Sequence, residues 1–205
     1  MTTITFLRHG PTQENHEGRI QGQQHGKLLV RETEAYLSAI TPLLRDKNPA
    51  ILISSDLERA TATRSILKDF LQIADIKEET LSLLRERAVG MYEGKLWTEI
   101  PSELQQQKDQ SMYDFRSGGG ENSQEVAQRV VETLKYFSRE YTDTLVCCVA
   151  HACWLQQLFH LVSPENLPPD WFDRTAVYET TLTPTGDIED FNLIQIQAKL
   201  PQDLG

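Results

Sequence analysis

Residues 5–15 read TFLRHGPTQEN, a strand-forming run that ends in Arg8 and His9 before Gly10 and Pro11 impose a turn. Strand ends often carry polar residues, so this pair could be incidental. The pair could equally handle an anion, because a guanidinium offers paired hydrogen-bond donors to one. The rest of the sequence has to decide between these two interpretations.

The composition indicates one acidic globular domain. The chain has 205 residues, with 20 Lys and Arg against 30 Asp and Glu, which gives a net charge of −10. Nucleic acids and anionic membranes attract clustered cations, so neither is an expected partner. An anionic substrate would have to be bound by a local group of arginines.

The cysteines and the N-terminus favour a cytoplasmic location. The chain has three cysteines, which is an odd number, and Cys147 and Cys148 are adjacent on an expected strand. This pattern does not indicate a disulfide framework. We interpret them as reduced core thiols, although a Cys153–His151 nucleophile pair is conceivable. No signal peptide is visible, and the most apolar run, residues 145–155, is too short to cross a bilayer.

Short apolar runs alternate with helical periodicity along the chain. Strands are expected at 4–7, 50–53, 144–150, 175–183 and 188–194, and helices at 28–45, 57–71, from a cap at Asn122 to about 141, and 153–162. The alternation predicts an α/β fold, a three-layer αβα sandwich with a mostly parallel central sheet. We expect one domain over residues 1–205, with the polar segment 95–120 as a lid or insertion.

Polar side chains follow three of the expected strands at the point where each strand ends. Arg8 and His9 end the first strand, Arg59 lies just beyond the second, and His151 follows the strand at 144–150. Ligands of open α/β sheets bind outside the carboxyl ends of the strands. Two arginines and two histidines are therefore expected to converge on one site.

The stretch LRERAVGMYEG at 84–94 adds a carboxylate, Glu86, flanked by Arg85 and Arg87. One interpretation is a surface loop with exposed ion pairs that contribute little to stability. The other is a loop that brings Glu86 to a phosphate site as a proton donor.

Five motifs in order resemble the histidine phosphatase superfamily, the phosphoglycerate mutase-like proteins. They are RHGPTQEN with RIQG (8–15, 19–22), SSDLERA (54–60), LRER with EG (84–87, 93–94), GGE (119–121) and VAH (149–151). The elements IQGQ, SSDL, LRER and EGK are most similar to the fructose-2,6-bisphosphatase type. The resemblance implies a phosphoglycerate mutase-like fold and an enzyme that acts on phosphate esters.

Phosphoryl transfer needs a nucleophile, cations around the phosphorus and a proton for the leaving oxygen. His9 is the candidate nucleophile, and Arg8, Arg59 and His151 are expected to bind the phosphoryl oxygens without a metal or other cofactor. Glu86 is the candidate general acid and then base, so one of its neighbouring arginines must turn away or onto the substrate. The resemblance further implies that the substrate pocket is lined by Asn15, Gln21 and Gly22, and we add Arg87.

The expected activity is metal-independent hydrolysis of small phosphomonoesters through a phosphohistidine, with sugar bisphosphates or phosphoglycerates as candidates. A phosphoglycerate mutase is the alternative. The mutases that the resemblance brings to mind are longer, with a basic insertion and tail, whereas the only basic residues between 94 and 120 here are Lys95, Lys108 and Arg116. A non-catalytic scaffold for a phosphorylated ligand or a protein also stays open, since Ala152 replaces the usual glycine. A zinc site of His9, His151 and Glu86 is disfavoured by the adjacent arginines.

Overall fold

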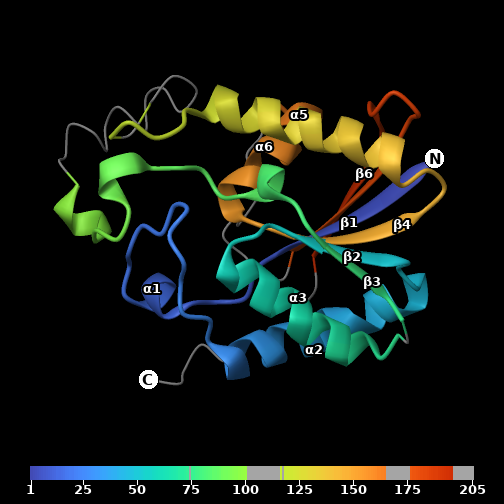
Figure 1. The fold of residues 1–205 in the computed structure, drawn as a ribbon, viewed down its shortest axis with the longest axis horizontal. Coiled ribbons are helices and arrows are strands. Elements are labelled where there is room, and N and C mark those ends of the chain that lie inside the picture. The colour runs from blue at the N-terminus through green and yellow to red at the C-terminus, as the bar shows by residue number, and fades with distance from the viewer. Residues whose placement is uncertain (74, 101–115, 117, 165–175, 196–205) are drawn as a thin grey trace.

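The fold is a six-stranded sheet between two layers of helices (Figure 1). The computed structural model describes residues 1–73, 75–100, 116, 118–164 and 176–195. The strands are β1 (Thr2–Arg8), β2 (Ile51–Ser54), β3 (Lys77–Thr80), β4 (Leu145–Ala150), β5 (Ala176–Leu182) and β6 (Ile188–Gln195). Their order is β3-β2-β4-β1-β5-β6. The first four run parallel, and β5 and β6 are antiparallel additions.

The helices are α1 (Gln13–His16), α2 (Val30–Lys47), α3 (Glu58–Leu71), α5 (Ser123–Glu140) and α6 (Ala152–Val162), with short 3₁₀ turns η1 (Ser82–Leu84), η2 (Gly90–Tyr92) and η3 (Trp97–Glu99). The predicted cap is confirmed, because the Asn122 side chain accepts from the Glu125 backbone N–H. Pro42 does not end α2, which continues to Lys47.

Two apolar clusters lie on opposite faces of the sheet. On one face Phe6 and Cys148 join a cluster with Phe137 of α5 and Trp154 of α6. On the other face Leu7 and Cys147 join a cluster with residues of α2 and α3. The adjacent cysteines thus point to opposite faces, because side chains alternate along a strand. The predicted αβα sandwich with a mostly parallel sheet is confirmed.

Both strand cysteines are free and buried in these clusters. Burial raises the pKa of Cys147 to about 12, so its thiol stays protonated near neutral pH. The third cysteine, Cys153, is also free and is partly exposed at the start of α6.

Strand β3 was not predicted, because its sequence KEET carries no apolar run. It forms an edge of the sheet beside β2. Its charged side chains find partners that lie elsewhere in the chain: Glu78 pairs with Lys68 on α3, and Glu79 accepts from the Tyr136 hydroxyl of α5. Charged residues on an edge strand also discourage pairing with another chain.

The register of the parallel strands aligns their carboxyl ends. Arg8 of β1 lies opposite Ala150 of β4, and Ser54 of β2 lies opposite Val149. The residues that follow these strands therefore emerge side by side at one edge of the sheet. Of the expected lid at 95–120, η3 is described, whereas 101–115 and 117 lie outside the described residues, as does most of the expected loop at 164–173.

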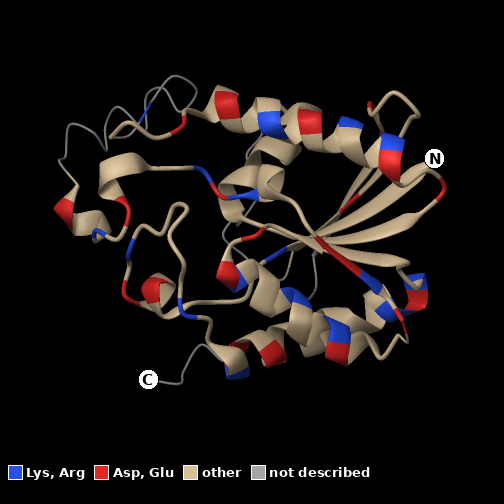
Figure 2. Cartoon of the chain, in the orientation of Figure 1, with Lys and Arg blue, Asp and Glu red and all other residues tan. Residues whose placement is uncertain are grey.

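Basic and acidic residues are interspersed along the outer helices (Figure 2). Among the helices in the described ranges, none has the length and apolarity needed to cross a bilayer.

Candidate active site

The three strand ends bring His9, Ser55 and His151 together with Arg59 of α3. The Arg59 Nε–H lies 3.3 Å from His9 Nε2, and the two imidazole ring centres are 5.0 Å apart. Ser55 Oγ lies 2.6 Å from His151 Nε2. His9, Arg59 and His151 are almost completely buried. The convergence expected from the strand ends is thus present in the fold.

The proton position on His9 follows from its hydrogen bonds. His9 Nδ1 lies 2.6 Å from the carbonyl oxygen of Gly10. A carbonyl oxygen only accepts, so Nδ1 carries the hydrogen and a neutral ring has a bare Nε2. The Arg59 Nε–H points to that same Nε2, which agrees with a lone pair there. The nitrogen left unprotonated is therefore the one that faces the arginine.

Arg59 also ties α3 to the loop that follows α1. Its two terminal nitrogens donate to the carbonyl oxygens of Gly22 and Gln24, at 2.7 and 2.5 Å. Burial lowers the pKa of Arg59 to about 10, with Arg8 acting in the same direction and Glu86 against it. The guanidinium therefore remains charged near neutral pH. Its Nε–H is aimed at His9 by a scaffold of backbone carbonyls.

Arg8 supplies a second buried cation at the end of β1, with 7% of its surface exposed. Burial lowers its pKa, and the negative charge of Glu86 is the strongest opposing influence. The backbone of Arg8 is fixed by α2, because the Tyr36 hydroxyl of that helix donates to the Arg8 carbonyl oxygen at 3.0 Å.

His151 is a neutral imidazole in this setting. Burial, followed by the charges of Arg59 and Arg8, holds its pKa well below the usual value. Its Nδ1 is buried and has no hydrogen-bond partner within the described part of the chain. His151 precedes α6, whose first residue is Ala152. The helical backbone at Ala152 accommodates a methyl group without strain, so the replacement of glycine does not disturb this turn.

Glu86 reaches the same region through the start of α6. Its carboxylate accepts from the backbone N–H of Arg87 at 2.8 Å and of Cys153 at 3.1 Å. Cys153 lies two residues after His151, so the carboxylate is anchored beside the second histidine. The positive end of the helix dipole faces it.

The arginines beside Glu86 turn to other partners. Arg85 donates from Nε to Asp56 Oδ1 at 2.7 Å, in a half-exposed ion pair. Arg87 is buried and donates from Nε to the carbonyl oxygen of Glu121 at 3.0 Å.

One clamp was not predicted from the sequence. Arg129 of α5 donates to both carboxylate oxygens of Glu121 and to the carbonyl oxygens of Leu83 and Arg85, at 2.7 to 3.0 Å. It thereby holds the backbone that leads to Glu86. Glu121 lies in the quoted GGE motif, but no local pattern marks Arg129, because its carbonyl partners Leu83 and Arg85 are over 40 residues away in the chain.

Three of the expected substrate-pocket residues, Asn15, Gln21 and Gly22, lie on α1 and in the loop that follows it. Asn15 Oδ1 accepts from the Thr12 backbone N–H at 3.1 Å and so caps α1. Gln21 Oε1 is buried without a hydrogen-bond partner. Gly22 has φ +52°, and a Cβ there would meet Glu93 Oε1 at 2.4 Å, so only glycine fits.

The disfavoured zinc site has no structural counterpart in the described ranges. Within them, no group of three or more His, Cys, Asp and Glu side chains is arranged to hold a metal ion.

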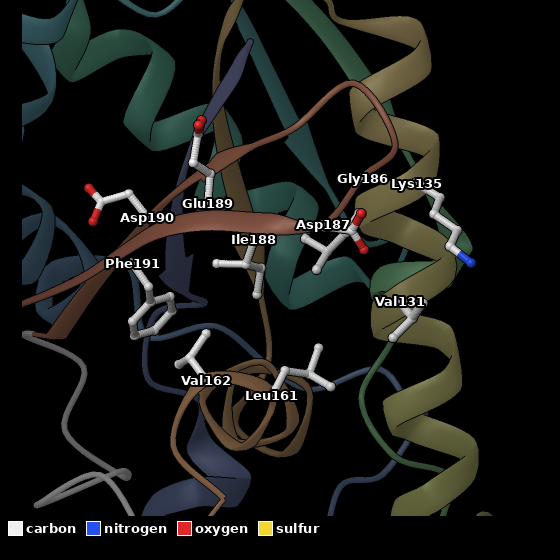
Figure 3. A pocket seen from close by; sticks show the side chains of 11 residues that line it. Val131, Lys135, Leu161, Val162, Gly186, Asp187, Ile188, Glu189, Asp190 and Phe191 are labelled. Carbon is white, nitrogen blue, oxygen red and sulfur yellow. The ribbon is translucent and has the colours of Figure 1, made fainter.

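A separate hollow of about 510 Å³ lies between α5, the end of α6 and the β5–β6 hairpin (Figure 3). Leu134, Val162, Ile188 and Phe191 are among its lining residues. Ile188 pairs with Leu182, which pairs with Thr2 at the start of β1. The hollow is therefore at the opposite end of β1 from Arg8, and it contains none of the expected site residues.

A bare imidazole nitrogen beside buried guanidiniums, at the carboxyl edge of a parallel sheet, defines an anion site suited to a phosphoryl group. Residues 4–189 match the family described as histidine phosphatase superfamily (branch 1). The chain belongs to this superfamily, and the resemblance drawn from the five motifs is confirmed.

Two curated relatives illustrate the range of the family. A metal-independent phosphoserine phosphatase of Arabidopsis thaliana is 27% identical, over 78% of this chain and 68% of that protein. The fructose-2,6-bisphosphatase TIGAR B of Danio rerio is 30% identical, over 64% of this chain and 51% of that protein. The chain thus spans about two thirds of the first relative and about half of the second.

Solved structures agree on the fold. YhfR of Bacillus stearothermophilus superposes with a TM-score of 0.81 at 22% identity, over 97% of this chain and 96% of that one. A mycobacterial glucosyl-3-phosphoglycerate phosphatase in complex with VO3 superposes with a TM-score of 0.73 at 22% identity, over 96% of this chain and 99% of that one.

Proposed function

We propose that this protein is a metal-independent phosphatase that hydrolyses small phosphomonoesters through a phosphohistidine at His9. One observation carries the proposal: the Gly10 carbonyl holds the hydrogen on His9 Nδ1, so Nε2 is the unprotonated nitrogen of a neutral ring and accepts from the Arg59 Nε–H. Membership of the histidine phosphatase superfamily supports the same reaction class.

In the first half-reaction, His9 Nε2 attacks phosphorus and the bond from phosphorus to the ester oxygen breaks. Arg8, Arg59 and His151 neutralise the charge on the phosphoryl oxygens. Glu86, anchored beside His151, gives its proton to the departing alcohol. The products of this step are the alcohol and a phosphohistidine.

In the second half-reaction, water attacks the phosphohistidine. Glu86, now ionised, takes a proton from the water as the new P–O bond forms and the P–N bond breaks. Inorganic phosphate leaves, and His9 and the protonated Glu86 return to their starting states. The cycle balances without a metal or other cofactor.

The substrate class follows from the family and from the relatives. The names of the relatives refer to phosphoserine, fructose 2,6-bisphosphate and glucosyl-3-phosphoglycerate, which are all small phosphomonoesters. We propose a small phosphorylated metabolite as partner, with no nucleic acid or membrane, in keeping with the net charge of −10. The free cysteines favour a cytoplasmic location.

The proposal is tested by trapping the intermediate. Rapid quenching with ³²P-labelled phosphoserine, and in parallel with 3-phosphoglycerate and fructose 2,6-bisphosphate, should label the wild-type protein on His9. His9→Ala should remove the label and the release of phosphate. His16→Ala is the matched control, because His16 is exposed on α1 and pairs with Glu32.

Two outcomes would overturn the proposal. Absence of both label and phosphate release across the substrate panel would favour the non-catalytic scaffold. Interconversion of 3- and 2-phosphoglycerate that outpaces phosphate release would favour the mutase, the activity for which the probable phosphoglycerate mutase GpmB of Escherichia coli is named.

A further inference from the structure

Ser55 occupies a fully buried position at the end of β2, directly beside the second histidine. Its backbone N–H donates to the carbonyl oxygen of Val149 at 3.2 Å, which fixes it against the end of β4. Its Oγ lies 2.6 Å from His151 Nε2 and also accepts from the Leu57 backbone N–H at 3.3 Å. The hydroxyl therefore bridges the histidine and the start of α3.

The hydrogens around this contact can be placed in two ways. If His151 Nε2 carried the hydrogen, Ser55 Oγ would accept from both Nε2 and Leu57, and its own hydrogen would have no acceptor among the contacts of Oγ. A lone pair would then remain on the buried Nδ1. In the site proposed above, that lone pair would repel a phosphoryl oxygen.

If the hydrogen of the His151 ring is placed on Nδ1 instead, every polar group of this contact except one has a hydrogen-bond partner. Ser55 donates its hydroxyl hydrogen to His151 Nε2 while accepting from Leu57. The hydrogen of the neutral ring is then on Nδ1, which is the buried atom without a partner. A buried N–H of the site without a partner calls for an explanation, and an anion that accepts from it is one.

We propose that Ser55 is a positioning residue that holds His151 as the Nδ1–H tautomer, so that Nδ1–H donates to a phosphoryl oxygen bound at His9. This inference rests on the proposed phosphatase function for its purpose, but the tautomer itself does not depend on turnover.

Both histidines are then Nδ1–H tautomers, but a different hydrogen bond fixes the tautomer of each ring. In His9 a carbonyl oxygen accepts from Nδ1–H and leaves Nε2 bare. In His151 a hydroxyl donates to Nε2 and leaves Nδ1–H available. One ring thus offers a nucleophile and the other a hydrogen-bond donor, although both are neutral imidazoles.

The tautomer is read directly by long-range ¹H–¹⁵N correlation spectra of the imidazoles, recorded at pH 8 without phosphate. The His151 signals are assigned by their loss in His151→Asn. The wild type should give the Nδ1–H pattern, and Ser55→Ala should give the Nε2–H pattern or a mixture. Ser54→Ala is the matched control, because Ser54 is an equally buried neighbour whose Oγ bonds to Arg64 instead. The control should keep the wild-type pattern.

Kinetics supply the second readout. Removal of one preorganised donor from a transition state lowers kcat by about a hundredfold in favourable cases, so we expect Ser55→Ala to lose at least about tenfold. Ser54→Ala should stay near the wild type.

An Nε2–H pattern for His151 in the wild type overturns the proposal, whether or not Ser55→Ala folds. A changed tautomer in Ser55→Ala with unchanged kcat overturns its role in the reaction. If the wild type lacks phosphatase activity while His151 is the Nδ1–H tautomer, the proposed function fails and the tautomer lock stands.

Discussion

The substitution Arg129→Met tests whether a salt-bridged clamp holds the segment that carries Glu86. Methionine keeps the apolar stem of the side chain and removes all the donors. The change abolishes the bonds to both Glu121 oxygens and to the carbonyl oxygens of Leu83 and Arg85, each 2.7 to 3.0 Å long. Glu121 is left with its Ala88 backbone donor at 2.8 Å.

The magnitude follows from burial. The Arg129 and Glu121 side chains are 17% and 21% exposed, so water can replace the lost donors only in part. Removing one partner of a buried pair costs about 3–5 kcal/mol, and residual exposure places this pair at the low end, about 3 kcal/mol. A second change, Glu121→Gln, removes the uncompensated charge and should restore about 1 kcal/mol.

The free energy of unfolding is measured by urea denaturation, and kcat is measured on the best substrate of the panel. Arg139→Met is the matched control, because Arg139 lies on the same helix in a pair that is 72% and 43% exposed. Exposed pairs contribute about 0–1 kcal/mol, so this control should stay near the wild type. We expect Arg129→Met to lower kcat about tenfold as the backbone before Glu86 loosens. Equal stability and equal kcat for the two variants would refute the clamp.

Three further predictions follow from single residues. Gly90 has φ +57°, and an added Cβ would lie 2.1 Å from the Gly118 carbonyl oxygen, so Gly90→Ala should cost about 2–4 kcal/mol in urea denaturation. Gly119→Ala, at φ +85° with no atom of the described residues within 4 Å of the added Cβ, should cost only about 1–2 kcal/mol; equal losses would refute the clash. Asn122→Ala removes the cap of α5 and should cost about 1 kcal/mol by the same measurement, whereas no loss would mean that the capping box contributes nothing. Because the pKa of His151 is lowered in the folded state, the unfolded chain binds a proton at this residue that the folded chain does not bind. The free energy of unfolding should therefore be highest near pH 8 and should fall below pH 6.5 by up to about 1.4 kcal/mol per pH unit. His151→Gln should lack that part of the slope in phosphate-free buffer, and an unchanged slope would contradict it.

The sequence predicted the layers and the edge of the sheet that carries the site. Buried strands are marked by local apolar runs such as 50–53 and 145–150, and helix starts by local caps such as Asn122. Once the strands are parallel, their carboxyl ends meet at one edge, so Arg8, His9 and His151 could be placed together before any coordinates.

The edge strand β3 could not be predicted in this way. Three of its four residues at 77–80 are charged, and their partners come from α3, from Tyr136 of α5 and from Tyr141 just after that helix. The direction of the arginines around Glu86 was also beyond local sequence. Arg85 turns to Asp56 and Arg87 to the carbonyl of Glu121, which are about 30 residues away in opposite directions along the chain.

The sequence by itself thus determined which chemical groups gather at the end of the sheet, because strand periodicity is a short-range property and parallel strands end at the same edge of a sheet. Only the tertiary structure decided the state of those groups. The approach of Arg59 to His9, the neutrality of His151 and the support of Glu86 each depend on one guanidinium, one buried environment or one helix end. Hydrogen bonds act over about 3 Å, and distances of that size between residues 50 to 100 positions apart exist only after the chain has folded.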